Sequence, residues 1–249
     1  MDSRRRNELD AVRVKSLFEE ESGYKRKYRE IMVGDQGFWS WVRYEVIMTL
    51  FGWIPGAVGL GLRYLFFRFL FKKVGKKVVF GRNMKIYSPH KISIGDQVVF
   101  DDQVFLDAKG VSNQGIEFGN RIFVGQNTII QTKNGDIRIE DDVNIGPFCY
   151  LTSTNYLRIG AKTYVGPYVL LMSGGEHDVH SPDFGPGRSL PLEIGESCWL
   201  AAKVTVFQDC HVGDHAVVGA AGVVNSPIPP NSVAVGIPAK VIKKLPPQD

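Results

Sequence analysis

From residue 80 onward, an aliphatic or aromatic residue returns every six positions, followed by a small residue and then by polar ones. The pattern starts at Phe80-Gly81 and returns in register at Ile94-Gly95, Phe118-Gly119 and Val124-Gly125. Later copies start at Ile139, Ile145, Ile159, Val165, Ile194, Leu200, Val212 and Val218. A period of six fits neither an α-helix nor a simple hairpin, and it is the signature of a parallel β-helix.

This repeat predicts how the β-domain is built. Three hexads form one triangular coil, and the recurring apolar residue points into a narrow interior. Each coil stacks on the next, so neighbouring coils stabilise one another and both ends need a cover. We therefore expect a β-helix domain over residues 80–227 and a C-terminal cap over residues 228–249. The rhythm stops at residues 172–193. Because a solenoid accommodates an insertion only outward from a corner, this loop should project from the prism.

Residues 38–79 follow a different pattern. They are dense in Trp, Phe, Leu, Ile and Val and are interrupted at Pro55-Gly56, which predicts helix, break, helix. A transmembrane span needs about 20 uninterrupted apolar residues, and each half is shorter or interrupted by charge. The features that favour a headgroup region are the aromatic residues Trp39, Trp41, Tyr44, Trp53 and Tyr64 and the lysines Lys72, Lys73, Lys76 and Lys77. We expect a membrane-associated hairpin; the alternative is a pair of helices packed over the β-domain or between subunits.

Charge is distributed unevenly along the chain. Residues 1–85 carry 18 Lys or Arg against 9 Asp or Glu, whereas residues 86–249 carry 12 against 17. A basic front predicts an anionic surface as partner. Nucleic acid is disfavoured because no nucleic-acid-binding fold accompanies the basic residues. Residues 1–37 are expected to form a charged helical arm without chemistry of their own.

The cysteines and the N-terminus bear on location. Cys149, Cys198 and Cys210 lack metal-ligand spacing and lie inside apolar repeats, where a small buried residue serves. A reducing cytoplasm fits this usage, and residues 1–30 lack the apolar core of a secretory signal. The prediction is a cytoplasmic protein, peripheral or monotopic on the inner face of the cell membrane.

The hexads, the loop Gly175-Glu176-His177-Asp178-Val179-His180 and the tail Gly236-Ile237-Pro238-Ala239-Lys240 resemble the hexapeptide-repeat acyltransferases. The resemblance covers about residues 80–245 and is strongest to galactoside, maltose and capsule or exopolysaccharide O-acetyltransferases. It implies a left-handed parallel β-helix, a homotrimer, and direct acyl transfer from acetyl-CoA without an acyl-enzyme.

The resemblance also places His177 at the position of the catalytic base. A hydroxyl group has too high a pKa to attack a thioester unaided, and an imidazole, which titrates near neutrality, accepts its proton. Asp178 or Glu176 is a candidate to fix the tautomer of that ring, as is a backbone carbonyl. His180 either binds the acceptor or positions His177.

The cofactor positions are likewise carried over from the resemblance. CoA is expected between two β-helices, with pantetheine running along the prism axis. The matching positions are Trp199, Ala202, Ala220, Asn225, Lys240 and Lys243. Asn225 and Ser226 stand where the relatives have Thr and Lys, so the resemblance does not carry over the phosphate contact of that lysine. The backbone N–H of Ala201 or Ala202 is the candidate donor to the developing oxyanion.

The sequence favours an acetyl-CoA-dependent O-acetyltransferase acting on a sugar hydroxyl of a glycan or lipid-linked saccharide. An N-acetyltransferase acting on an amino sugar or nucleotide sugar is the alternative. A γ-carbonic-anhydrase-like zinc enzyme is disfavoured, because the sequences around the five histidines do not reproduce the ligand pattern of that enzyme class, so no metal is expected. A non-catalytic trimeric scaffold is disfavoured by the intact loop histidine. His90, His211 and His215 are expected to be surface residues.

Overall fold

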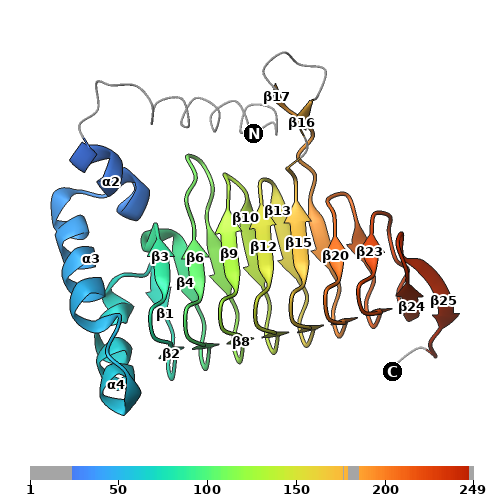
Figure 1. Cartoon of the computed structure of the whole chain (residues 1–249), viewed down its shortest axis with the longest axis horizontal. Coiled ribbons are helices and arrows are strands. Elements are labelled where there is room, and N and C mark those ends of the chain that lie inside the picture. Colours follow the sequence, from blue (N-terminus) through green and yellow to red (C-terminus); the bar gives the residue numbers. More distant parts are fainter. Residues whose placement is uncertain (1–23, 176, 179–184, 247–249) are drawn as a thin grey trace.

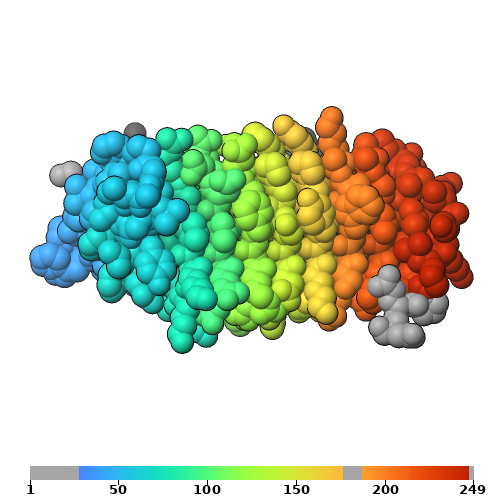
Figure 2. Space-filling model, turned by 90° about the horizontal axis from the view of Figure 1, so that it is seen from below, coloured from blue at the N-terminus to red at the C-terminus, as the bar shows by residue number. Residues whose placement is uncertain are grey.

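The computed structural model describes residues 24–175, 177–178 and 185–246. Three parallel sheets form the faces of a long prism, which confirms the predicted β-helix (Figure 1). In the view from below, the helical segment lies at one end of the prism and the C-terminal strands lie at the other (Figure 2). Each coil contributes one strand to each sheet, and the described residues contain seven complete coils.

We call the three faces sheets A, B and C in the order in which each coil passes through them. Sheet A contains β1 Lys73–Val74, β4 Ile92–Ile94, β7 Ile116–Phe118, β10 Asp136–Ile139, β13 Tyr156–Ile159, β18 Leu192–Ile194 and β21 His211–Val212. Sheet B contains β2 Val79–Phe80, β5 Val99–Phe100, β8 Phe123–Val124, β11 Asn144–Ile145, β14 Tyr164–Val165, β19 Trp199–Leu200, β22 Val217–Val218, β24 Ser232–Val235 and β25 Lys240–Lys244. Sheet C contains β3 Lys85–Tyr87, β6 Phe105–Asp107, β9 Ile129–Thr132, β12 Tyr150–Ser153, β15 Leu170–Ser173, β20 Thr205–Val206 and β23 Val223–Val224.

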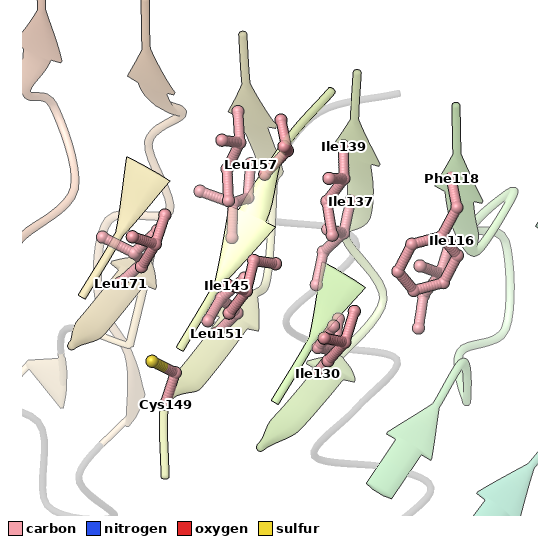
Figure 3. Close-up of a cluster of buried hydrophobic side chains, with 14 of the residues drawn as sticks. Ile116, Phe118, Ile130, Ile137, Ile139, Ile145, Cys149, Leu151, Leu157 and Leu171 are labelled. Atoms are coloured by element: carbon pink, nitrogen blue, oxygen red, sulfur yellow. The ribbon is translucent and has the colours of Figure 1, made fainter. Parts of the chain in front are cut away.

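The interior is filled by the residue that recurs every six positions. Ile139, Ile145 and Leu151 come from the three sheets of one coil, and all three are fully buried. Figure 3 shows such side chains from neighbouring coils pointing into one continuous core. The three cysteines lie in the same core and are free thiols. The hexad pattern therefore predicts the inward positions correctly.

The corners of the prism explain the small residue that follows each inward one. A Cβ atom on Gly146 would lie 2.8 Å from the backbone nitrogen of Pro167 on the next coil, closer than real Cβ atoms approach. Two residues later the chain turns through positive φ, as at Phe148 (φ 59°) and Asn127 (φ 57°). Stacked corners thus require a small residue first and a left-handed residue afterwards.

The N-terminal segment forms a helical cap over the first coil. It contains α2 Tyr24–Val33, α3 Phe38–Phe51, α4 Gly56–Phe66 and the short η1 Phe67–Phe69. The predicted break lies between α3 and α4. In the described chain, no helix is both long enough and apolar enough to cross a membrane.

Polar and aromatic contacts join the cap to the prism. Arg63 is buried, and its guanidinium donates to the carbonyl oxygens of Phe80 at 2.8 Å and Ile54 at 2.7 Å. The hydroxyl of Tyr44 donates to the carbonyl of Ile86 at 2.8 Å. The ring of Phe67 packs against that of Phe80, with centroids 5.5 Å apart. These contacts show that one face of the cap covers the prism end, as the alternative interpretation of this segment expected.

The opposite end of the prism is closed by β24 and β25. β24 continues sheet B in parallel with β22, and β25 then returns antiparallel to it. Within β24, Ser232 and Ala234 are fully buried. Every residue of β25, in contrast, is exposed.

Candidate active site

The loop predicted to carry the chemistry leaves the prism where sheets C and A meet. β15 ends at Ser173, and the chain returns to the prism at Leu192. Between them, β16 His177–Asp178 pairs antiparallel with β17 Gly185–Pro186, with His177 opposite Pro186. Figure 1 shows this pair standing out from the edge of the prism. His180 and Glu176 lie outside the described residues, and for His177 and Asp178 only the strand is described.

A polar cluster, not predicted from the sequence, anchors both stems of this loop. The hydroxyls of Thr154 and Ser189 are 2.6 Å apart, and the side-chain amide of Asn155 donates to the carbonyl of Ser189 at 2.7 Å. The hydroxyl of Ser173 donates to the carbonyl of Leu190 at 3.0 Å. Ser173 and Ser189 are both buried. The available signal was the polar run 152–155 inside an otherwise apolar hexad register, one coil before the loop.

The first loop residue is held close to this cluster. Gly174 has φ of 89°, and a Cβ atom there would collide with the Thr154 hydroxyl. The glycine therefore allows the chain to leave β15 directly above Thr154. The base of the loop is fixed on both sides, so the strand that carries His177 starts from a defined position.

Five of the six predicted cofactor positions lie on sheet B or at its corner with sheet C, toward the C-terminal end of the prism. Ala202 and Ala220 lie in successive turns at the corner between sheets B and C, where the Ala221 N–H donates to the carbonyl of Ala202 at 2.9 Å. Trp199 lies in register between Tyr164 and Val217 on sheet B and is 52% exposed.

The remaining cofactor positions lie farther along the same end. Asn225 follows β23 and is exposed, and Lys240 and Lys243 are exposed on β25. Three strand spacings separate β19 from β25, roughly 14 Å at ~4.8 Å per spacing. Asn225 lies apart from the other positions, at the corner where the chain passes from β23 of sheet C toward sheet A.

The structure does not bring the loop and the alanine turns together within one chain. The strand of His177 rises from the edge between sheets C and A, whereas Ala202 and Ala220 lie at the edge between sheets B and C. Sheet C separates these two edges.

One candidate oxyanion donor is excluded by the backbone ladder. The N–H of Ala201 donates to the carbonyl of Val218 at 2.9 Å, so it is already engaged. Ala202, which begins the turn, remains the candidate of the two.

A pair of aromatic residues at the corner of the alanine turns was also missed. The rings of Phe148 and Tyr168 stack with centroids 5.0 Å apart and planes at 6°. Both residues have φ near 60° and are about half exposed. Bulky residues rarely adopt this conformation. The repeated Gly-Pro-aromatic sequences at 146–148 and 166–168 carry the signal.

Other reactive groups give little support to a different chemistry. Burial raises the pKa of Cys149, Cys198 and Cys210 to about 11, so these thiols are poor nucleophiles at neutral pH. Among the described side chains, no three His, Cys, Asp or Glu residues form a group that could hold a metal. A groove over the outer face of sheet A, between β1 and β13, contains none of the predicted site residues.

Comparison with known proteins identifies the family. WbbJ of Escherichia coli (strain K12), named for O-acetyl transfer in lipopolysaccharide biosynthesis, is 31% identical over 146 residues, which cover 54% of this chain and 74% of WbbJ. The chain belongs to the hexapeptide-repeat acyltransferases. WcaF of the same organism, named for colanic acid biosynthesis, is 28% identical over 201 residues, which cover 81% of this chain and 84% of WcaF. No family model matches the chain.

Two further proteins are similar to this chain, one in sequence and one in fold. Galactoside O-acetyltransferase of Escherichia coli is 31% identical over 130 residues, and the match spans only 56% of that relative's length. The structure of a variant of AntD, an N-acyltransferase from Bacillus cereus in complex with dTDP and coenzyme A, superposes with a TM-score of 0.50 at 19% identity. That match covers 72% of this chain and 87% of AntD, and it shows a shared fold.

Proposed function

We propose that this acyltransferase moves an acetyl group from acetyl-CoA to a hydroxyl of a saccharide, with His177 as general base. The observation that supports this most is the hairpin that projects from the prism with its base anchored and carries His177. This hairpin follows the fifth coil, and the first cofactor positions, Trp199 and Ala202, lie in the sixth. The names of WbbJ and WcaF, which concern lipopolysaccharide and colanic acid biosynthesis, support a saccharide acceptor.

The proposed reaction is a direct transfer. The imidazole of His177 takes the proton of the acceptor hydroxyl as its oxygen attacks the thioester carbon. The carbonyl oxygen gains negative charge, which the N–H of Ala202 stabilises. The C–S bond then breaks, and the thiolate of CoA receives the proton from the imidazolium. Asp178 or Glu176 fixes the tautomer of His177, and His180 contacts the acceptor.

CoA lies along the prism in this proposal. Pantetheine follows the turns of Ala220 and Ala202, where small side chains let it approach the backbone. Lys240 and Lys243 on the exposed β25 attract the phosphates. Trp199 borders the thioester end, whereas Asn225 lies at the corner between sheets C and A, on the same edge of the prism as the loop.

A homotrimer of left-handed β-helices completes the site. Because one chain holds the loop and the alanine turns on different edges, each groove needs parts from two copies. A closed threefold ring supplies three equivalent grooves. Mixing His177→Ala subunits with subunits altered at Ala202 should restore part of the activity, since one groove then draws intact parts from both chains. Verified mixing without any recovery would place the whole site in one chain.

The cap is proposed to bind the inner face of the cell membrane. Its outer face exposes Phe38, Trp39, Val46, Leu50, Trp53, Val58, Leu60, Tyr64, Leu65 and Phe69. Along one side of α3 and just beyond its end, exposed residues recur at helical spacing, namely Trp39, Arg43, Val46, Leu50 and Trp53. Arg43 and Arg68 are exposed on the cap, and Lys72, Lys73, Lys76 and Lys77 are exposed directly after it in the chain, at the start of the first coil. Aromatic residues with flanking lysines match an anionic headgroup layer.

The proposed acceptor is therefore a lipid-linked saccharide at the cytoplasmic surface. N-acetylation of an amino sugar is the second candidate, favoured by the likeness to the N-acyltransferase AntD. Both products carry an acetyl group, but mild alkali releases it only from an ester.

The test uses purified full-length protein with acetyl-CoA and a panel of soluble sugars and amino sugars. Release of the CoA thiol that depends on the sugar, with an acetylated product by mass spectrometry, is the expected result. Alkali-labile product supports O-transfer. Thiol release that no sugar or amino sugar increases would contradict the proposed function.

A further inference from the structure

The cap and the loop that carries His177 lie at different levels of one continuous stack. The cap covers the coil of β1, and the loop leaves the prism after β15, in the fifth coil. Four strand spacings separate these coils, about 19 Å at ~4.8 Å per spacing. One layer of helices adds roughly 10 Å. The base of the loop therefore lies about 30 Å from the outer face of the cap.

This spacing is held by every element between the two levels. All three sheets run without a gap from the first coil to the fifth, as Figure 1 also shows. At the corner between sheets A and B, side chains of the second, third and fourth coils accept from the backbone of the coil before. The N–H groups of Asp96 and Asn120 donate in this way to Asn120 and Asp141, at 2.9 and 2.8 Å. The prism acts as a stiff spacer, in contrast to a flexible linker.

The cap is also attached rigidly to this spacer. The buried side chains of Arg63 and Tyr44 donate hydrogen bonds to backbone carbonyl groups of the first coil. The exposed aromatic and basic face of α3 lies opposite the buried Tyr44 and Ile47, and Tyr44 bonds the first coil, so this face points away from the coils. A bilayer bound to that face would meet the prism end-on, with the coils stacked away from it.

We propose that the number of coils between cap and loop selects the acceptor by height above the membrane. Interfacial helices sink about 5–10 Å, which leaves the loop roughly 20–25 Å above the bilayer surface. A sugar joined directly to its lipid lies below that level. The acceptor is then a lipid-linked saccharide whose acetylated sugar is separated from the lipid by several other sugar units. This inference rests on the proposed acetyl transfer and membrane contact.

The upright orientation is measured by energy transfer to labelled lipids. Gln97 and Lys162 are exposed at the same corner, in the second and fifth coils, and the three native cysteines are buried. Gln97→Cys and Lys162→Cys would each carry a fluorophore on vesicles of phosphatidylcholine and phosphatidylserine with acceptor dye on the headgroups. Transfer should be clearly weaker from position 162, which lies roughly 14 Å farther along the axis. Equal transfer from both positions would overturn the proposal.

The height itself is tested with spacers. The sugar acetylated in the soluble assay is coupled to a lipid through rigid spacers of increasing length and placed in the same vesicles. Acetylation should begin only above a threshold length. Duplicating residues 137–156, one coil in register between β10 and β13, should raise that threshold by about 4.8 Å. Soluble-sugar activity shows whether this variant is folded, and the wild-type series is decisive without it.

The outcomes separate the two proposals. Absence of acetylation of any soluble sugar or amino sugar contradicts the proposed function itself. Acetylation of the soluble sugar, together with equal rates at the shortest and longest spacers, contradicts only the selection by height. A threshold that the folded, active duplication variant leaves unchanged contradicts it as well.

Discussion

The helical cap and the β-helix bury apolar side chains in opposite ways. Each inward residue of the coils is enclosed by three sheets, and Leu106, Leu151 and Val165 have no exposed surface. The cap buries one face only, so Trp39 remains 79% exposed and Val58 71% exposed. Folding therefore buries the apolar side chains of the coils. Many apolar side chains of the cap remain exposed to solvent. Large exposed apolar patches mark interaction sites, which supports the proposal that the cap binds a membrane while the loop carries the chemistry.

The largest expected effect separates chemistry from binding. His177→Ala should lower turnover by about 10² to 10⁴, because the general base is lost. Binding to vesicles should not change, because the cap is intact. His211→Ala, at an exposed histidine of β21, is the matched control. Steady-state kinetics and vesicle sedimentation measure both properties.

Two results would change this assignment. Turnover of His177→Ala within roughly tenfold of wild type would place the base elsewhere. His180→Ala should cause a smaller loss, mainly in KM for the acceptor, and a larger loss than for His177→Ala would exchange their roles.

A core substitution tests the enclosed side of the comparison. Leu151 lies between Ile130 and Leu171 in sheet C and has no exposed surface. Leu151→Ala should lower the free energy of unfolding by about 2–5 kcal/mol, because it leaves a cavity in the interior. Ile242→Ala, on the 65% exposed β25 residue, should change it little. Denaturant unfolding of both variants measures the difference, and similar losses would argue against a closed core.

Substitutions in the cap test its open side. Trp39→Ser and Trp53→Ser should each weaken vesicle binding roughly tenfold, from the loss of about 1.5 kcal/mol of apolar burial. Acetyl transfer to a soluble sugar should stay unchanged. Phe207→Ser removes a 40% exposed aromatic from the β-helix and serves as control. If all three variants bind vesicles as well as wild type, the proposed membrane contact is wrong and the cap serves only to cover the first coil. Point changes are preferable to deleting residues 1–75, which would expose Phe80.

The repeat allowed much of the fold to be predicted, because one period fixes both strand and inward face. Ile94, Phe118 and Ile139 were placed inside by spacing alone, and all are buried. The packing of the cap could not be predicted in this way, because the sequence pattern of a short apolar helix does not indicate which of its faces contacts the rest of the protein. Arg63, which lies within the apolar run of α4, turns inward and donates to carbonyl groups.

The candidate site was predictable only in part. The lost rhythm located the loop of His177, but hexad spacing does not tell which corner a given turn occupies relative to another. The separation of that loop from Ala202 by sheet C therefore emerged only from the structure. The anchors Thr154 and Ser189 are 35 residues apart, beyond the reach of any local pattern.

The smallest expected effect concerns the junction between cap and coils. His90 was expected on the surface, but its Nδ1 atom is buried without a hydrogen-bond partner, in a small cavity lined also by Arg43 and Tyr44. Burial lowers the pKa of His90, the neighbouring Lys91 lowers it further, and Asp35 opposes them. The folded state thus disfavours the imidazolium.

A histidine whose pKa falls on folding contributes stability that is present above its unfolded pKa, about 6.5, and is lost as pH falls toward the folded value. The cap junction should therefore weaken below about pH 6.5. His90→Gln cannot titrate, so wild type should lose stability relative to this variant between neutral and mildly acidic pH. Denaturant unfolding followed by the tryptophan fluorescence of the cap measures the difference, and parallel pH profiles for the two proteins would remove His90 as the cause.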